Sequence, residues 1–392
     1  EPLLSIEKID LLFQVLFDWY QVSPEDTLDG GRALLILPKG ISGLTLCIGN
    51  RTVLHERDIS ATYRSLIEAS NQFLGVSHSI VGAHEFKFWN HLPDRMGVPN
   101  ELLSNELYSK LLDFYCFEIA ELNQFINVNI DLIDSYVSLP STHYPVQYLM
   151  LKTIGKCWPL GASLKKANPD RAIVKVCLWC GAGSLTEQIE SELLTRFFQS
   201  MNVEVTLFRS NETTKNEFIK IYESNDFDII WVMSHGEFDH WKPGVVSVEI
   251  GNNQYLSLDE ALNLSIPESD KRRLLFLNIC DGATHSGSDG LERLGFAPSL
   301  ANNNQCVISH LWPVTAWSAA TFGAIYSSYL TSEGNFFTAF ESTLNDMTGG
   351  NIAVMNRLSE VSNHCQDLID RLNNQNNDFD LIANSGSSVF IQ

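Results

Sequence analysis

The chain has 392 residues, of which 44% are apolar, and a formal net charge of -21 with only 26 lysines and arginines. This length and apolar content are sufficient for one large hydrophobic core or two modest ones. The shortage of basic residues argues against direct binding of nucleic acid or of an anionic membrane. No apolar run reaches the roughly 18 residues of a transmembrane helix, so neither a membrane span nor a signal peptide is predicted.

The eight cysteines are spread thinly along the chain. They are too sparse for a disulfide framework and suit a reducing compartment, so the sequence predicts a cytoplasmic protein. The chain begins at Glu1 rather than at a methionine. We therefore expect it to be a piece of a longer protein, with a sensor or repeat region upstream.

The pattern of apolar and polar residues differs between two regions of the sequence, and we predict domains over residues 1–135 and 136–392. In residues 1–135, amphipathic helical patterns surround the stretch ALLILPKGISGLTLCIGNRTVLHE, whose two apolar runs predict a β-hairpin turning at residues 40–43. This first region is therefore expected to be α+β.

From Arg171 onward, short continuous apolar runs alternate with helical segments. The runs cover residues 172–179, 203–208, 227–233, 273–279 and 306–312, and the helices are expected from Leu185, over 215–222 and from Trp317. Continuous apolar strands separated by helices indicate a parallel sheet covered on both faces. The predicted fold class is α/β, with a mostly parallel sheet and helices on both of its faces.

In such a sheet, catalytic residues lie beyond the carboxyl ends of the strands. Reactive side chains follow two of the predicted strands. His235 and Gly236 follow the apolar run 227–233, and Cys280 and Asp281 follow the apolar run 273–279. A histidine on a neighbouring strand end can take the proton of a thiol, and main-chain N–H groups of Gly236 and Cys280 can hold an oxyanion. A lone cysteine or histidine is more often structural, but the matching positions favour a catalytic pair.

The same residues carry a family resemblance. The segments FDIIWVMSHGEF, LLFLNICDGATHSG and CVISHLWPVTAWSAATFGAIYSSYL resemble the histidine block, the cysteine block and the following strand of CHAT domains. CHAT domains are caspase-like cysteine peptidases related to caspases, metacaspases and separases. The resemblance spans residues 32–348 and is weaker in the N-terminal third, which would be a pseudo-caspase-like region. One departure is Thr315 and Ala316, which stand where family members often carry an acid.

This resemblance implies a cysteine endopeptidase with His235 and Cys280 as catalytic residues and Gly236 as an oxyanion donor, without metal or cofactor. It implies activation by a partner protein or an upstream sensor, commonly in bacterial defence systems. The alternative is a non-catalytic caspase-like module that scaffolds or senses. The long segments 237–254 and 281–291 are expected to be loops that reposition on partner binding, so the isolated chain should be weakly active.

Substrate contacts are predicted at four positions. Asp281 either shapes the primary specificity pocket or caps a loop, and the turn that resembles the family's pocket wall supplies Leu311, Trp312 and Val314. Selection of an acidic residue before the cut would need convergent guanidinium groups. The basic residues 271–273 precede the strand that ends before Cys280, so they fall at the opposite edge of the sheet and cannot line the pocket. Asn278, two residues before Cys280, is neutral, which weakens a strict selection for arginine or lysine. A neutral or basic residue before the cut is therefore predicted.

Three weaker motifs have plainer interpretations. Cys177 and Cys180 form a CxxC pair without a second pair at zinc-finger spacing, which favours strand packing over metal binding. The GAGS turn lacks a full nucleotide-binding fingerprint, and Ser184 with Glu187 reads as a helix capping box. A metal centre built on three histidines, at 240, 285 and 310, stays open as an alternative to the catalytic site.

Overall fold

The structure is a computed structural model. It describes residues 145–161, 167–238, 246–251, 253–283, 295–374 and 377–392, together with four strands nearer the N-terminus. The helices expected within residues 1–135 lie outside the described residues. Among the described residues, no helix has both the length and the apolar character that crossing a membrane requires.

The strands nearest the N-terminus form a sheet of their own. Strands β1 (Leu34–Pro38) and β2 (Leu44–Ile48) pair antiparallel, which confirms the predicted hairpin. Strand β3 (Arg51–His55) continues the antiparallel pairing, and β4 (Val137–Ser138) pairs with β1 in parallel. The division of the chain at residues 135 and 136 stays a prediction.

The large sheet of the C-terminal part is mostly parallel, as the continuous apolar runs predicted. Its order is β13-β12-β11-β7-β5-β6, and only β13 runs antiparallel to its neighbour. Every residue of β7, β11 and β12 is buried, which explains why their sequences lack polar alternation. The strands are β5 (Lys175–Cys180), β6 (Glu204–Phe208), β7 (Ile229–Met233), β11 (Arg273–Asn278), β12 (Gln305–His310) and β13 (Ser388–Ile391).

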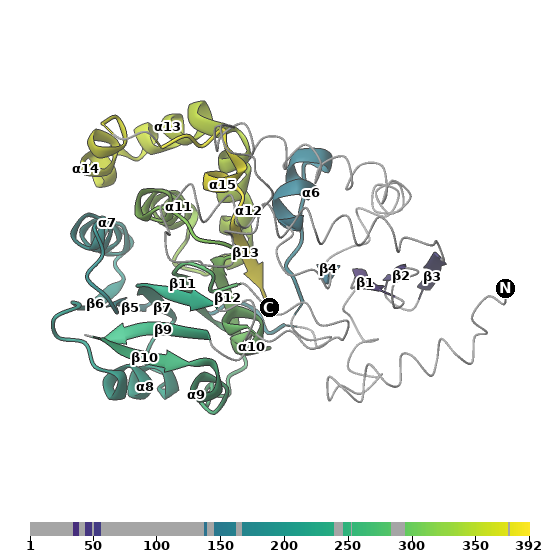
Figure 1. Cartoon of the computed structure of the whole chain (residues 1–392), viewed down its shortest axis with the longest axis horizontal. Coiled ribbons are helices and arrows are strands. Elements are labelled where there is room, and N and C mark those ends of the chain that lie inside the picture. The colour runs from purple at the N-terminus through teal and green to yellow at the C-terminus, as the bar shows by residue number, and fades with distance from the viewer. Residues whose placement is uncertain are drawn as a thin grey trace, which may run out of the picture.

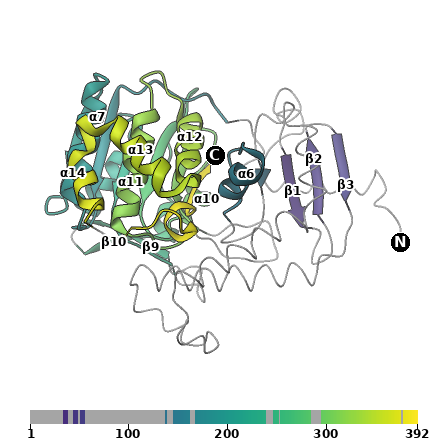
Figure 2. The ribbon, with the colours of Figure 1, turned by 90° about the horizontal axis from the view of Figure 1, so that it is seen from above.

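Helices cover both faces of this sheet, as expected (Figure 1). One face carries α7 (Glu187–Ser200), α11 (Ala316–Tyr329), α12 (Phe336–Thr348), α13 (Gly350–Glu360) and α14 (Ser362–Leu372), which overlie it in Figure 2. The other face carries α8 (Lys215–Glu223), α9 (Leu258–Leu262) and α10 (Phe296–Leu300). The short helices α6 (Val146–Ile154) and α15 (Ile382–Ser385) complete the described helices. Aromatic rings fill the core between sheet and helices, with Trp231 and Phe276 4.1 Å apart between ring centroids.

A second, three-stranded antiparallel sheet follows the histidine strand. It consists of β8 (Gly236–Phe238), β9 (Val246–Gly251) and β10 (Gln254–Ser257), in the order β10-β9-β8. The prediction of a loop over residues 237–254 is therefore wrong for most of its described part. Alternation is the physical reason: Val248 and Ile250 are buried on one side, and the Ile250 carbonyl accepts a 2.9 Å hydrogen bond from the indole of Trp179.

The predicted start of α7 also needs correction. The helix begins at Glu187 with Thr186 at the N-cap position, and no side chain caps it. The predicted capping box is absent because the Glu187 carboxylate accepts hydrogen bonds from the hydroxyl and N–H of Ser210 instead. Leu185 therefore precedes the helix and is 78% exposed.

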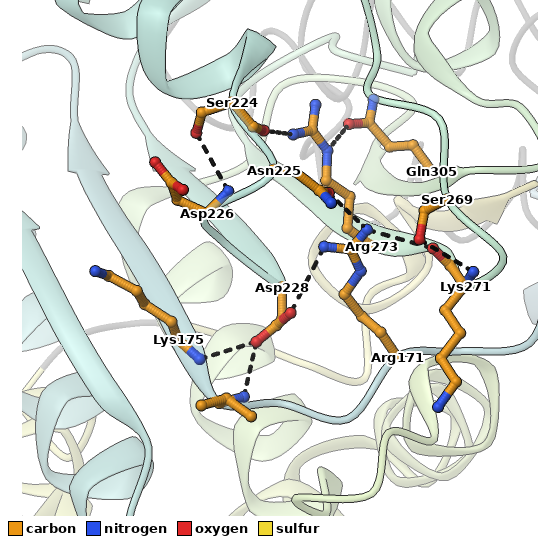
Figure 3. Close-up of polar contacts among 11 residues, drawn as sticks. Arg171, Lys175, Ser224, Asn225, Asp226, Asp228, Ser269, Lys271, Arg273 and Gln305 are labelled. Carbon is orange, nitrogen blue, oxygen red and sulfur yellow. Dashed lines mark hydrogen bonds and ion pairs between the residues drawn. The ribbon is translucent and has the colours of Figure 1, made fainter.

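Polar side chains tie together the amino-terminal ends of the parallel strands (Figure 3). The Asp228 carboxylate accepts the N–H groups of Val174 and Lys175 and lies 3.6 Å from the guanidinium of Arg171. Arg273 begins β11 at this same edge, opposite Gln305. The basic residues 271–273 thus lie at the sheet edge remote from His235 and Cys280, as predicted.

Candidate active site

The pairing of β7 with β11 brings the two predicted catalytic residues to the same level. Met233, the last residue of β7, lies opposite Asn278, the last residue of β11. His235 and Cys280 each follow two residues later. Because the strands are parallel neighbours, both residues leave the sheet side by side at its carboxyl edge, where α/β folds build their sites.

Gly236 brings the two segments into direct contact. A Cβ atom at position 236 would lie 2.1 Å from the carbonyl oxygen of Cys280 and 3.2 Å from Cδ1 of Ile279. Only glycine allows the main chain after His235 to approach the main chain of Cys280 so closely. This observation shows more directly than any other that the histidine and cysteine segments lie against each other.

The main chain on both sides of the His235 side chain is held by hydrogen bonds. Its carbonyl accepts a 3.0 Å hydrogen bond from the N–H of Glu249 on β9. The hydroxyl of the preceding residue, Ser234, donates to the Glu249 carbonyl. The His235 side chain is exposed. The imidazole therefore projects to solvent from a fixed piece of backbone, which suits a group that must exchange protons with a substrate.

The surroundings of Cys280 favour the protonated thiol. Cys280 is half-buried, and its Sγ donates to the carbonyl oxygen of Val314 at 3.7 Å. Burial, reinforced by the negative charge of Asp281, raises the pKa of the Cys280 thiol to about 12. Since the thiolate is the nucleophile, this arrangement keeps Cys280 protonated at neutral pH.

The four predicted substrate-binding residues are all buried in this structure. Asp281 is 3% exposed and adopts a left-handed backbone with φ of +56°, a conformation that is uncommon outside glycine and concentrated at functional sites. Leu311 and Val314 are buried, and the fully buried Trp312 donates its indole N–H to the carbonyl of Ala383 at 2.9 Å. Their contact with substrate stays a prediction and requires the main chain around them to move.

The other motifs take structural places. Cys177 and Cys180 are buried in β5, which fits strand packing. Of the three histidines of the open metal alternative, only His310 is described; burial lowers its pKa to about 3, and both of its ring nitrogens are engaged by protein side chains. Within the described part of the chain, no three His, Cys, Asp or Glu side chains are arranged to hold a metal ion.

Sequence reasoning missed a buried carboxylate beside the site. Glu190 on α7 is 3% exposed and accepts a hydrogen bond from Asn278. A signal for it exists in the sequence, because Glu190 shares the stripe of Leu193, Leu194 and Phe197, all of which are buried. An acid in line with an apolar stripe indicates a carboxylate that faces the core.

Comparisons with known proteins give a family match and several distant structural similarities. The family model of the CHAT domain matches residues 162–353. No curated protein matches the chain.

Among solved structures, one described as "Structure of Protease" is 10% identical, covering 63% of this chain and 50% of that one, with a TM-score of 0.32. The Saccharomyces cerevisiae separase–securin complex is 13% identical over 97% of this chain and 31% of that one, with a TM-score of 0.44. The complex of Porphyromonas gingivalis RgpB pro- and mature domains is 10% identical over 92% and 78%, with a TM-score of 0.40.

The chain thus spans half the length of the first of these structures and less than a third of the second. Likenesses this distant support no conclusion about activity. The family match confirms the resemblance seen at the two strand ends, and residues 162–353 of this chain are a CHAT domain.

Proposed function

We propose that the chain is a caspase-like cysteine endopeptidase in which Cys280 is the nucleophile and His235 the general base. The observation that carries this proposal is the close approach of Gly236 to the Cys280 carbonyl, which sets the two strand ends against each other. The family match supports the same reaction class. No metal or cofactor enters the proposal.

The reaction follows from the chemistry of the two side chains. His235 takes the thiol proton as the sulfur of Cys280 attacks the scissile carbonyl carbon, and N–H groups of Gly236 and Cys280 hold the oxyanion. The C–N bond then breaks, and the amine leaves with the proton from His235. Water, deprotonated by His235, attacks the resulting thioester, which releases the acid and restores the thiol.

Substitution of either proposed catalytic residue is expected to abolish cleavage. Cys280→Ala and His235→Ala are to be compared with Cys365→Ala and His364→Ala, which alter residues of the same types on α14. Cut sites in a proteome-derived peptide library are read by mass spectrometry in the presence of cell extract as a source of activator. Cleavage by either site variant at the wild-type rate would reject the pair and favour the scaffold alternative.

The same library tests the proposed substrate class, a neutral or basic residue before the cut. Two arginines of the catalytic part are engaged at the remote edge: Arg272 with Asp170 and Gln392, and Arg273 with Gln305. Neither is available to pair with an acidic side chain near Cys280. A majority of aspartate before the scissile bond would contradict this preference.

We further propose that a partner protein or an upstream sensor activates the enzyme, in a defence-type system as the resemblance implies. The support is the closed state of the site. The thiol donates to Val314, its pKa is raised to about 12, and the surrounding Asp281, Leu311 and Trp312 are buried. A substrate can reach the sulfur only after this contact opens.

The raised thiol pKa gives the closed state a measurable signature. In the purified chain, alkylation of Cys280 by iodoacetamide should be slow at neutral pH and rise about tenfold per pH unit, without a plateau below about pH 10. The rate is followed by mass spectrometry of the Cys280 peptide, with Cys280→Ala to assign it. A plateau near pH 7 would mean that the resting thiol is already activated.

A further inference from the structure

A series of buried hydrogen bonds crosses the sheet at Asn278, close to the proposed nucleophile. Asn278 lies two residues before Cys280, and its Nδ2 donates to Oε1 of Glu190 on α7. On the other side, Asn278 Oδ1 is 2.8 Å from Nε2 of His310 on β12. Nδ1 of His310 is in turn 3.1 Å from the hydroxyls of Ser387 and Ser388, at the start of β13.

The donor and acceptor roles along this series of hydrogen bonds follow from the carboxylate of Glu190 at its end. Because Asn278 uses its amide N–H to bind Glu190, its Oδ1 must accept, so Nε2 of His310 carries the hydrogen. Nδ1 then accepts from the serine hydroxyls. Burial lowers the pKa of His310 to about 3, which keeps the ring neutral and consistent with one donor and one acceptor. Every bond therefore runs the same way, from β13 to the carboxylate.

Glu190 is enclosed by the core rather than by solvent. A Cβ atom on Gly323 of α11 would lie 2.9 Å from Cζ2 of Trp231 and 3.5 Å from Oε1 of Glu190, so this helix packs directly over the carboxylate. Burial raises the pKa of Glu190 to about 7, and the hydrogen bond from Asn278 opposes that rise. A carboxylate in such a place costs stability, so a contribution to stability does not account for it.

We propose that Glu190 and Asn278 are positioning residues, whose hydrogen bond fixes the end of β11 and thereby the placement of Cys280 against Gly236 and His235. The inference rests on the proposed peptidase function. Strand β11 ends at Asn278, and the main chain then turns through Cys280 to the left-handed Asp281. The side chain of Asn278 is hydrogen-bonded on both sides just before that turn. It ties the strand to α7 on one side and to β12 on the other.

Two substitutions of Glu190 separate positioning from stability. Glu190→Gln keeps an acceptor for Asn278 and removes the charge, whereas Glu190→Met has a similar volume and removes the acceptor. Both relieve the cost of a buried carboxylate, but Glu190→Met leaves the amide N–H of Asn278 without its acceptor, which costs stability. The thermal midpoint is therefore expected to hold in Glu190→Gln and to fall by a few degrees at most in Glu190→Met, which leaves the fold intact at the assay temperature. Peptide turnover should stay near the wild-type value in Glu190→Gln and fall about tenfold or more in Glu190→Met, because small displacements of a nucleophile are costly.

Alkylation of individual cysteines provides the second readout. Released from its anchor, Cys280 in Glu190→Met should react several-fold faster with iodoacetamide, while the buried Cys177, Cys306 and Cys365 react as slowly as in the wild type. Faster alkylation of Cys280 combined with slower peptide turnover is not expected if Glu190 only stabilises the fold. Uniformly faster alkylation of all four cysteines would indicate loosening of the fold and overturn the proposal.

Two further outcomes would also overturn it: Glu190→Met indistinguishable from wild type, or Glu190→Gln as impaired as Glu190→Met, since the charge would then be the requirement. Failure of the peptidase proposal is recognised separately. In that case the wild-type chain cleaves nothing even with cell extract, and the alkylation rates alone decide whether Glu190 positions Cys280.

Discussion

Replacing Gly236 by alanine is expected to lower peptide turnover by about a hundredfold or more while the fold persists. The new methyl carbon would fall 2.1 Å from the carbonyl oxygen of Cys280, a distance that no real pair of such atoms tolerates. Relief must come from movement of the main chain on one side, so either His235 or Cys280 leaves its place. Alanine keeps its main-chain N–H, so the loss would report on geometry rather than on a missing oxyanion donor.

The matched control is Gly183→Ala, which adds the same methyl group to another glycine after a strand of the same sheet. There the nearest atom outside the flanking residues is Oγ of Ser210 at 3.6 Å, an ordinary van der Waals contact. Turnover of the control should stay within about twofold of the wild type, since surface substitutions away from special contacts change little. Library cleavage and thermal melting are measured for both variants. A Gly236→Ala variant as active as the control would refute the proposed site, in which Gly236 must approach Cys280 closely.

The strand ends could be predicted because burial on both faces leaves a simple trace in the sequence. A strand of a covered parallel sheet is apolar throughout, and the first polar residues after it mark the carboxyl edge. That pattern located His235 and Cys280. It could not give the register that sets Met233 opposite Asn278, because strand pairing depends on contacts between segments far apart in the chain.

The elements missed by sequence reasoning fail for identifiable physical reasons. Strands β8, β9 and β10 are short and follow glycine-bearing segments, so their alternation at Val248 and Ile250 was outweighed by loop signals. The burial of Glu190 was not predicted, although this residue shares the apolar stripe of α7. Its burial depends on Gly323, which lies on α11 and brings that helix close to α7. Such packing between distant helices has no local sequence signature.

Arg273 is the described residue whose removal should most affect stability. It is 1% exposed, and its guanidinium donates to Gln305 Oε1 at 2.7 Å and to the Ser224 carbonyl at 2.9 Å (Figure 3). It also donates to the Tyr222 carbonyl at 2.7 Å. Both carbonyls lie at the C-terminal end of α8, where the helix dipole is negative. The ring of Tyr222 lies 4.8 Å from the guanidinium carbon, which adds a cation–π contact.

These neutral acceptors together take the place of a carboxylate partner. Burial lowers the pKa of Arg273 to about 10, which still leaves the side chain charged at neutral pH. Arg273→Met would remove the desolvation cost of the charge, but it would leave two buried acceptors and one part-buried acceptor without their donor. Each orphaned acceptor costs about 1–3 kcal/mol, so the loss should exceed the relief.

We expect Arg273→Met to lower the thermal midpoint by roughly 6–12 °C, which corresponds to about 3 kcal/mol for a unit of this size. The thermal midpoint of Arg273→Lys should lie between those of the wild type and Arg273→Met, because a single ammonium cannot reach three separate acceptors as the fork of arginine does. The control is Arg196→Met, whose side chain is 40% exposed and pairs with Glu192 at 3.5 Å and Asp367 at 3.2 Å. Exposed pairs of this kind contribute about 0–1 kcal/mol, so the control midpoint should hardly move. Equal midpoints for Arg273→Met and Arg196→Met, measured by calorimetry at one protein concentration, would show that α8 is not anchored to β11 through this guanidinium.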